Sequence, residues 1–206
     1  MDFIWCGKKI KSTIKQKHNI SKVKIGHAGT LDPLATGLLI VCTGKFTKKI
    51  TEIQEQKKTY VGELILGKTT PSYDLETNFD AYFPTQHIND EMLIAASKSF
   101  IGKIDQIPPL YSALKVKGER LYQKARRGEK VKISSRKVEI SSFILTDISL
   151  PKIQFKIVCS KGTYIRSIAY DFGKKVVSGA YLSSLTRTTI GEHMLSNSIE
   201  IHDILN

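Results

Sequence analysis

The sequence predicts an α+β fold in which a mixed, mostly antiparallel sheet is flanked by helices. Strand-like and helix-like segments follow one another without the regular strand–helix–strand repeat of a parallel α/β protein. The glycines at 26 and 29 do not open a helix in the pattern of a phosphate loop or a dinucleotide fingerprint. Because no internal repeat or Pro/Ser-rich linker divides the chain, residues 1–206 are expected to form a single domain.

The first half of the chain predicts two helices, a loop and a strand. Residues 8–19 have the pattern of a basic, weakly amphipathic helix. Residues 25–37 (IGHAGTLDPLATG) contain three glycines and a proline, which indicates a loop. Residues 60–66 (YVGELIL) are typical of a strand. Asn89, followed by two acidic residues, predicts the capped start of a helix that runs to about residue 101.

The second half is expected to be richer in strands. Residues 119–127 favour a helix that stops at Gly128, and residues 131–150 favour one long strand or a pair. In residues 153–159 the apolar side chains at 153, 155, 157 and 159 alternate with Gln154, Lys156 and Val158, which is the clearest strand pattern in the chain. The apolar period then becomes helical over residues 165–176. Side chains at such a strand-to-helix junction lie at a sheet edge, where functional sites are often built.

The charge of the chain favours nucleic acid as its partner. Thirty-two Lys and Arg face nineteen Asp and Glu, which gives a formal net charge of +13. A surplus of this size attracts polyanions. No membrane association is expected, because the longest apolar run, residues 37–42 (GLLIVC), is far too short to span a bilayer.

The cysteines and the first residues favour a cytoplasmic protein. The start of the chain lacks the apolar core and cleavage site of a signal peptide. Cys6, Cys42 and Cys159 match no disulfide or metal-ligand spacing and are interpreted as thiols of a reducing cytoplasm. We expect no metal and no cofactor.

A basic segment, residues 115–137, concentrates the positive charge. It contains ten Lys or Arg against only Glu119 and Glu129, together with Tyr122. A solvated surface is the ordinary explanation of a charge run. Because this run is so little compensated, a strip that follows a phosphate backbone is at least as well supported.

The loop around Asp32 is the most informative stretch. Pro33 pushes Asp32 out of the helical region, and the surrounding glycines allow the backbone to turn and to approach a ligand closely. An aspartate in such a loop can be a turn residue, a metal ligand or a nucleophile. From spacing alone the turn residue is favoured, and His27 would be an ordinary polar loop residue.

Four stretches resemble the TruB family of bacterial tRNA pseudouridine-55 synthases. GHAGTLDPLATGLL resembles the family's signature loop, and Lys58-Thr59-Tyr60 resembles the motif that carries its active-site tyrosine. The block PPLYSALKVKGERLYQKAR, residues 108–126, and the segment CSKGTYIR, residues 159–166, match in the family's order. The resemblance runs from about Ile25 to Gly191 and implies the pseudouridine synthase fold.

The resemblance implies three catalytic residues. Asp32 would be the carboxylate that acts as nucleophile or as base, and both roles stay open. Arg166 would pair with Asp32, favouring its ionised form and fixing its orientation. Tyr60 would stack on the uracil and help to move the C5 proton, although without the motif cross-strand packing would be the better explanation of a tyrosine there.

Further residues are expected to bind the substrate. The target uridine must leave the folded loop, and a side chain such as His27 could fill the space that it vacates. Tyr164 would line the pocket or pack the strand–helix corner, Leu182 would pack against the base, and Asp74 would reach the substrate or cap a turn. The full expected substrate-binding set is His27, Asp74, Tyr164, Leu182, Lys115, Arg120 and Arg126.

Two departures from the family pattern set the expected extent of the protein. The chain begins after the position of the family's N-terminal DKPxGxTS-like motif, which is expected to be missing. Fifteen residues follow Gly191, so no separate C-terminal RNA-binding (PUA-type) domain is expected. The expected partner is the T stem-loop of tRNA. No obligate protein partner is expected, and the chain is expected to be a monomer.

Three alternatives remain beside the tRNA uridine isomerase. One is a related synthase that acts on another RNA, such as a guide-RNA-dependent member. The second is a non-catalytic tRNA-binding or tRNA-folding protein that keeps the fold, which the missing N-terminal motif would favour. The third, a basic ribosome-associated protein, explains the charge but not the loop around Asp32.

Overall fold

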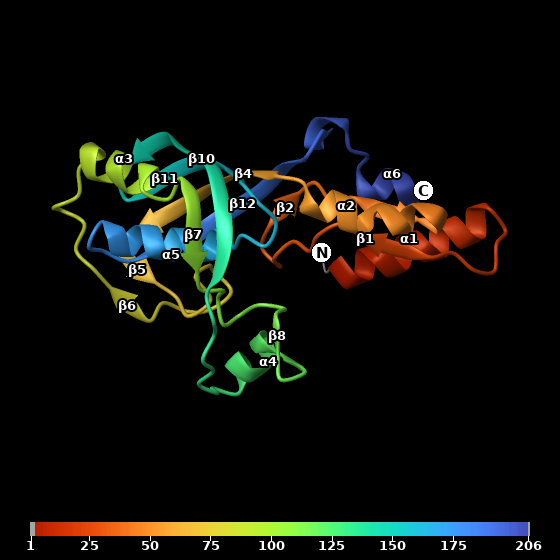
Figure 1. Cartoon of the computed structure of the whole chain (residues 1–206), viewed down its shortest axis with the longest axis horizontal. Helices are drawn as coiled ribbons and strands as arrows, with labels where there is room; N and C mark the ends of the chain where they lie inside the picture. Colours follow the sequence, from red (N-terminus) through yellow and green to blue (C-terminus); the bar gives the residue numbers. More distant parts are fainter. Residues whose placement is uncertain (1–2, 206) are drawn as a thin grey trace. The chain divides into compact units, whose positions relative to one another are not determined.

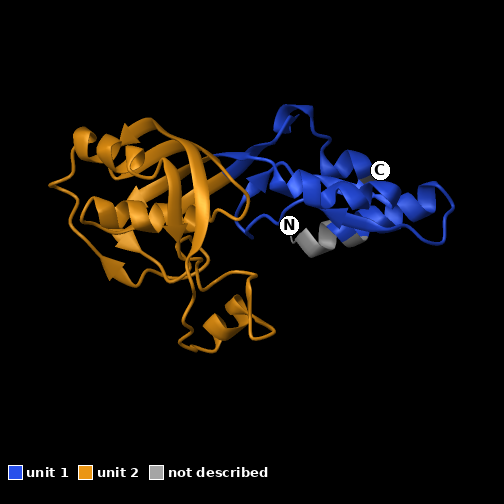
Figure 2. Ribbon diagram, viewed as in Figure 1, with its two compact units in different colours: residues 1–60, 186–206 blue, residues 61–185 orange. Residues whose placement is uncertain are grey.

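The computed structural model describes residues 3–205, which form two compact units (Figure 2). Unit 1 comprises residues 1–60 and 186–206, and unit 2 comprises residues 61–185. Strands β4 (Lys58–Leu66) and β12 (Ala180–Ile190) each contribute residues to both units. None of the helices formed by residues 3–205 has the length and hydrophobicity of a membrane-spanning segment.

Unit 1 contains the loop that carries Asp32, which short strands hold at both ends. Strand β1 (Ile25–His27) pairs antiparallel with β3 (Val41–Thr43), and β2 (Thr36–Gly37) pairs parallel with β12. Residues 25–37 are therefore largely loop, as the sequence predicts, with a short strand at each end. The remaining elements are α1 (Phe3–Lys17), η1 (Gly44–Lys49), α2 (Ile50–Glu55), β13 (His193–Met194), η2 (Leu195–Asn197) and α6 (Ile201–Leu205) (Figure 1).

Unit 2 holds most of the sheet. The seven-stranded sheet has the order β13-β12-β4-β11-β10-β7, with β2 pairing β12 at the side of this path. Antiparallel pairing joins β10 (Arg136–Ser149) to β11 (Lys152–Cys159) and to β7 (Gly102–Gln106). The predicted α+β class with a mixed, mostly antiparallel sheet is thus confirmed. The other elements are β5 (Lys68–Thr69), β6 (Ala81–Tyr82), α3 (Asp90–Lys98), β8 (Lys115–Val116), β9 (Glu119–Arg120), α4 (Leu121–Arg126) and α5 (Ile165–Lys175).

The core of unit 2 lies where α5 and α3 pack beside the sheet. Strand β11 places every second side chain in this core, which confirms its predicted alternation: Ile153, Phe155, Ile157 and Cys159 are buried. Phe143 of β10 lies at the centre of an aromatic cluster, with ring centroids 5.9 Å from Phe155 and 5.7 Å from Phe172 of α5. The chain between β7 and β10 leaves the sheet to form β8, β9 and α4 (Figure 1).

Helix boundaries follow local capping. The Asn89 side chain accepts a hydrogen bond from the Met92 amide, so the predicted N-cap of α3 is confirmed. Gly128 follows α4 with φ +71°, a conformation that other residues adopt only with strain, and its amide bonds the Ala125 carbonyl. Cys42 and Cys159 are buried, whereas the side chain of Cys6 lies outside the described residues.

Candidate active site

A buried arginine holds the Asp32 loop in unit 1. Arg187 of β12 is 1% exposed, and its guanidinium donates to the carbonyl oxygens of Leu38 at 2.8 Å and Gly29 at 3.1 Å. A longer contact reaches the Thr30 carbonyl at 3.4 Å. The three bonded carbonyls flank the half-buried Asp32, so one cation fixes the backbone on both sides of it.

Two glycines let the loop approach β12 this closely. Gly37 has φ +99°, and a Cβ there would lie 2.4 Å from the Arg187 carbonyl oxygen. Gly29 has φ +121° and lies next to the Arg187 guanidinium. Within the loop, the Ala35 amide closes a turn onto the Asp32 carbonyl at 3.0 Å. The glycines that the sequence marks as permissive are therefore needed for backbone approach.

His27 ends β1 beside this loop. Burial lowers the pKa of its imidazole below the ordinary value of 6.5, and the charge on Arg187 lowers it further against a raising hydrogen bond with Gly29. Near pH 7 the ring is therefore neutral. An uncharged ring suits the expected role of filling the space that the target uridine vacates, which stays a prediction.

The lowered pKa of His27 predicts a loss of stability in acid. Between the two pKa values the unfolded chain binds the proton more readily than the folded chain does. The contribution of His27 to the free energy of unfolding is therefore fully present above pH 6.5 and is lost as the pH falls through the lowered pKa. Urea unfolding at pH 7.5 and 5.0 should show that the free energy of unfolding decreases less between these pH values for His27→Gln than for the wild type. Equal losses in the two proteins would contradict the prediction.

Tyr60 lies in β4, as the sequence predicts, and is half-buried at the end of unit 1. Its neighbour Thr59 is anchored to β12, because the Thr189 hydroxyl donates to the Thr59 hydroxyl at 2.7 Å. A second contact between the two strands, 3.3 Å from the Thr188 hydroxyl to the Thr59 carbonyl, holds Thr59 against β12 in the same position. The backbone that carries Tyr60 is thereby held in place.

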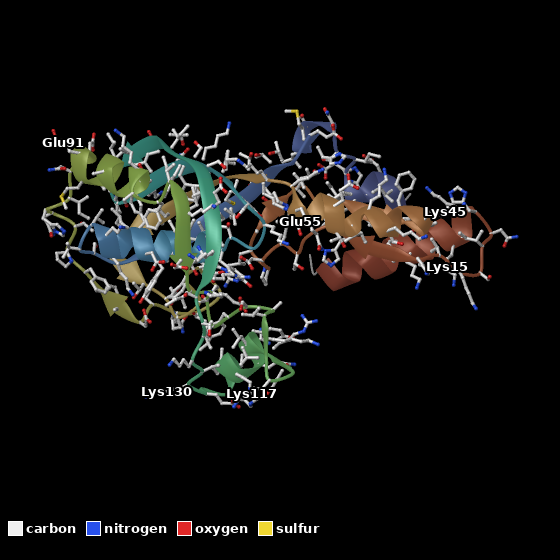
Figure 3. The ribbon with its side chains drawn as sticks, in the orientation of Figure 1. Lys15, Lys45, Glu55, Glu91, Lys117 and Lys130 are labelled. Carbon is white, nitrogen blue, oxygen red and sulfur yellow. The ribbon has the colours of Figure 1, made fainter. Side chains whose placement is uncertain are left out.

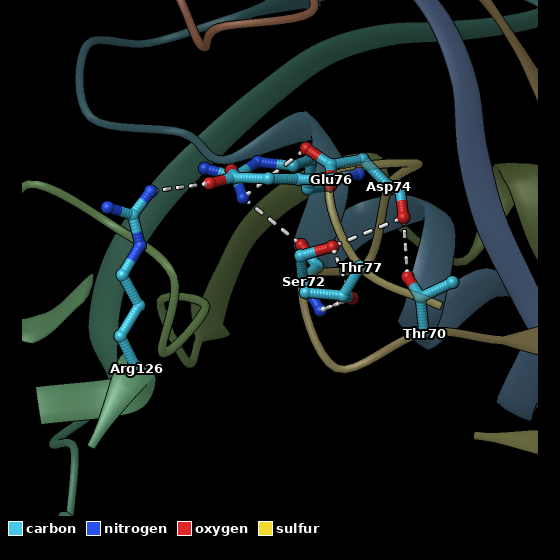
Figure 4. A network of polar contacts seen from close by, with 7 residues as sticks. Thr70, Ser72, Asp74, Glu76, Thr77 and Arg126 are labelled. Carbon is cyan, nitrogen blue, oxygen red and sulfur yellow. Dashed lines mark hydrogen bonds and ion pairs between the residues drawn. The ribbon is translucent and has the colours of Figure 1, made fainter. Parts of the chain in front are cut away.

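A network of polar contacts in unit 2 joins Thr70, Ser72, Asp74, Glu76 and Thr77 and extends to Arg126 (Figure 4). Arg166 lies in the first turn of α5, is 1% exposed, and donates to the Ser72 carbonyl at 3.1 Å. The same nitrogen lies 3.5 Å from a carboxylate oxygen of Asp74, which is also buried. The other carboxylate oxygen of Asp74 accepts a hydrogen bond from the Glu76 amide at 2.9 Å. Asp74 therefore both caps its turn and pairs with Arg166.

The turn that carries Asp74 is also held against α5 by an aromatic stack. Tyr73 adopts φ +65°, which is strained for a non-glycine residue, and its ring stacks on Tyr170 with centroids 4.0 Å apart. Burial, reinforced by the nearby Tyr170, Asp171 and Asp80, raises the pKa of Tyr73 to about 12. The Leu182 amide donates to the Tyr73 carbonyl at 2.9 Å, so the expected base-packing leucine lies beside Asp74.

Tyr164 lies where the sequence predicts, at the N-cap of α5. The Gln106 side chain, itself 1% exposed, donates to the Tyr164 carbonyl at 3.0 Å and accepts from the Tyr164 amide at 2.8 Å. The Arg136 guanidinium covers the Tyr164 ring, with its central carbon 4.4 Å from the ring centroid. Tyr164 is thus fixed through its backbone and through one ring face.

The basic segment is partly neutralised by its own glutamates. Lys124 lies 3.1 Å from Glu119 and 3.3 Å from Glu129, and Arg127 approaches the same carboxylates at 2.6 and 2.7 Å. Hydrogen bonding by Arg127, then by Lys124, lowers the pKa of Glu119 to about 2, so its charge persists at neutral pH. Of the ten cations in the segment, Lys124 and Arg127 are therefore the two that these glutamates engage.

Other cations of the segment point into solvent. Lys115 and Arg120 lie directly opposite each other across the β8–β9 pair, and both are exposed. Like charges facing each other across two strands repel, so an anion placed between them would relieve the repulsion. Arg126 lies on the face of Tyr122 and 3.4 Å from Glu76. Lys117 and Lys130 extend from the same part of the chain (Figure 3).

The structure gathers the expected residues into two groups. Unit 1 contains His27, Asp32 and Tyr60, whereas Arg166 and the remaining expected binding residues belong to unit 2. The expected pairing of Arg166 with Asp32 joins residues of different units and stays a prediction. Among the described residues, no group of three or more His, Cys, Asp or Glu could hold a metal ion.

Sequence reasoning missed Arg187 and Gln106, and counted Arg136 only as one more cation of the basic segment. These three residues lie in strands, and nothing in the local composition of those strands marks them as functional. Only the burial of a charged or amide side chain, which a single sequence does not display, distinguishes them from surface residues. Ser72 was missed because it acts through its backbone carbonyl.

Comparison with known proteins identifies the family. Residues 15–165 match the N-terminal domain of the TruB family of pseudouridylate synthases. The chain belongs to this family. It is therefore a pseudouridine synthase, an isomerase.

Individual TruB-family relatives resemble the chain over most of their length. It is 59% identical over 180 residues to tRNA pseudouridine synthase B of Flavobacterium johnsoniae, covering 87% of this chain and 79% of the relative. It is 50% identical over 200 residues to tRNA pseudouridine synthase B of Parabacteroides distasonis, covering 96% of this chain and 85% of the relative.

A solved structure has the same fold. A chain in the crystal structure of a Cbf5-Nop10-Gar1 complex is 26% identical to this one, with a TM-score of 0.66. The comparison covers 95% of this chain and 49% of the solved chain, so the TruB-family chain spans about half the length of that structure.

Proposed function

We propose that this chain converts the T-loop uridine at position 55 of tRNA to pseudouridine. The observation that carries the proposal is its 59% and 50% identity to two relatives named tRNA pseudouridine synthase B, over 79% and 85% of their length. The net charge of +13 gives a tRNA substrate the long-range attraction that it needs.

The proposed reaction is an exchange of glycosidic bonds. The N1–C1′ bond breaks, the uracil turns, and a C5–C1′ bond forms. The C5 proton leaves to solvent and N1 gains a proton, so the product is an isomer of the substrate. Asp32 acts as nucleophile at the ribose or ring, or as base. Tyr60 stacks on the uracil and assists the movement of the C5 proton.

The target base must first leave the stack of the tRNA loop. Unstacking costs a few kcal/mol, which new stacking contacts can offset. His27 supplies a neutral ring for this purpose in unit 1. Tyr164 supplies a ring in unit 2 whose backbone is already fixed by Gln106, so little ordering is required when the base arrives.

Tritium release tests the proposal. The wild-type protein is expected to release tritium from C5-labelled uridine in unmodified tRNA and in a T-loop hairpin. A transcript with cytidine at position 55 should release none from that position. Release that maps to another uridine would overturn the T-loop assignment. Binding without any release would instead identify a non-catalytic tRNA-binding or tRNA-folding protein.

Binding of tRNA is expected to weaken steeply with added salt, and part of the slope should come from Lys115 and Arg120. Removing one cation that neutralises a phosphate should reduce the slope of log K against log salt by about one. The double variant Lys115→Gln/Arg120→Gln should therefore reduce it by about two, as measured by filter binding across a salt series.

Lys124→Gln provides the comparison for this slope. Lys124 is already engaged by Glu119 and Glu129, so its removal should change the slope much less than removal of the opposed pair. If the wild-type protein showed a flat salt response, or if the double variant kept the full slope, the phosphate-binding role of the segment would be wrong.

A further inference from the structure

Arg136 combines a charged side chain with two buried donors that lack an acceptor. It begins β10 and lies opposite Gln106 of β7. Its Nε and Nη2 atoms are buried and have no hydrogen-bond partner among the described residues. Nη1 lies 3.5 Å from where a Cβ on Gly162 would stand, and Gly162 has φ +76°. The turn before Tyr164 therefore lies beside the guanidinium, with space for ordinary van der Waals contact.

Such donors are costly in a folded protein. A guanidinium stays charged at any physiological pH, so it cannot avoid the cost by losing its proton. Buried polar groups without a partner are rare in native proteins, and a charged one is the most unfavourable kind. Stacking on the Tyr164 ring stabilises the cation but supplies no acceptor in the plane of its N–H groups.

The two donors form one edge of the guanidinium. Nε–H and Nη2–H point in nearly the same direction and match two oxygens of a phosphate or carboxylate. The net charge of the chain and its membership of an RNA-modifying family make phosphate the anion that this edge will meet. The neighbouring Tyr164 ring is expected to lie against the target nucleotide, which places a backbone phosphate within reach of the same corner.

We propose that Arg136 binds a single backbone phosphate of the substrate RNA through Nε–H and Nη2–H. This inference rests on the proposed function and adds a substrate-binding residue to it. In the free protein Arg136 supports the Tyr164 ring. In the complex the same guanidinium ties the RNA backbone to that ring, so the nucleotide and the tyrosine are positioned by one group.

Stability and binding separate this role from a purely structural one. Arg136→Met keeps an extended side chain against Tyr164 and removes both unsatisfied donors. The free protein should therefore unfold at the same urea concentration as the wild type, or a higher one. Its Kd for a T stem-loop RNA should rise about 10- to 100-fold. Arg136→Lys, which keeps the charge but loses the fork, should recover only part of this affinity.

Methylphosphonate scanning identifies the phosphate. Neutralising one phosphate at a time in the T stem-loop should reveal one position that weakens binding to the wild type but not to Arg136→Met. Arg127→Met is the control, because Glu119 and Glu129 already engage that guanidinium, and it should show no such coupling.

Several results would overturn the proposal. These are unchanged RNA affinity of Arg136→Met, a large loss of its stability without loss of affinity, coupling to no single phosphate, and coupling to a uracil carbonyl in modified-base RNAs. Failure of the proposed function is seen separately, as RNA binding without tritium release by the wild type. Absence of RNA binding by the wild type would overturn both.

Discussion

Asp32→Asn is expected to abolish isomerisation, with a fall in tritium release of at least about 10⁴-fold. The amide keeps the size of the side chain and cannot act as the nucleophile or base. The loop should keep its conformation, because Arg187 holds it through the carbonyls of Gly29, Thr30 and Leu38 and not through the Asp32 carboxylate. Single-turnover assays with labelled tRNA, together with tRNA binding by the same variant, measure the two properties separately.

A second aspartate provides the matched control for this experiment. Asp147→Asn changes an exposed carboxylate on β10 and keeps an acceptor for the Ser149 hydroxyl. It should retain wild-type turnover. Asp32→Asn with more than about a hundredth of wild-type activity would remove Asp32 from the proposed chemistry. A variant that lost tRNA binding along with turnover would show that the carboxylate acts in binding.

Asp74→Ala is expected to destabilise the protein by about 3 kcal/mol. The substitution removes an anion from beside the buried Arg166 guanidinium and leaves the Glu76 amide without the acceptor that caps the turn. Because the turn is otherwise held by Thr70 and Ser72 hydroxyls on the Asp74 carbonyl, the fold should persist. Urea unfolding followed by near-UV circular dichroism measures the change.

Two variants divide this loss into its parts. Asp74→Asn keeps an acceptor for the Glu76 amide but lacks the charge, so its loss should be smaller. Asp80→Ala, at an exposed position nearby, removes only a hydrogen bond from the Thr69 hydroxyl and should cost about 1 kcal/mol. If Asp74→Ala were no more harmful than Asp80→Ala, the pairing with Arg166 would carry little stability.

The sequence predicts those elements whose pattern is local. The β11 alternation, the Asn89 cap and the helical period of α5 each depend on neighbouring residues, and all three are confirmed. Strand β12 was not predicted. Its residues AYLSSLTRTTI begin with three consecutive buried positions, Ala180, Tyr181 and Leu182, so both faces of the strand are covered there and the two-residue period is hidden.

The candidate site divides in the same way. Motifs located Asp32, Tyr60, Tyr164 and Arg166, and the structure places the last two at the predicted strand–helix junction. The ion pair of Arg166 with Asp74 brings together residues that are far apart in the chain, and no local pattern encodes it. The contacts of Arg187 are likewise long-range, since its acceptors lie about 150 positions earlier.

The anchoring of the Asp32 loop by Arg187 also affects how its order can be measured. The guanidinium binds carbonyl oxygens, so the contacts that fix Gly29 and Thr30 engage no amide hydrogen of the loop. Amide hydrogen exchange reports on protected N–H groups, and it will therefore underestimate how well ordered the backbone of this part of the loop is. Carbonyl ¹³C shifts, or the relaxation of the Arg187 side chain, report directly on the hydrogen bonds between the guanidinium and the loop carbonyls.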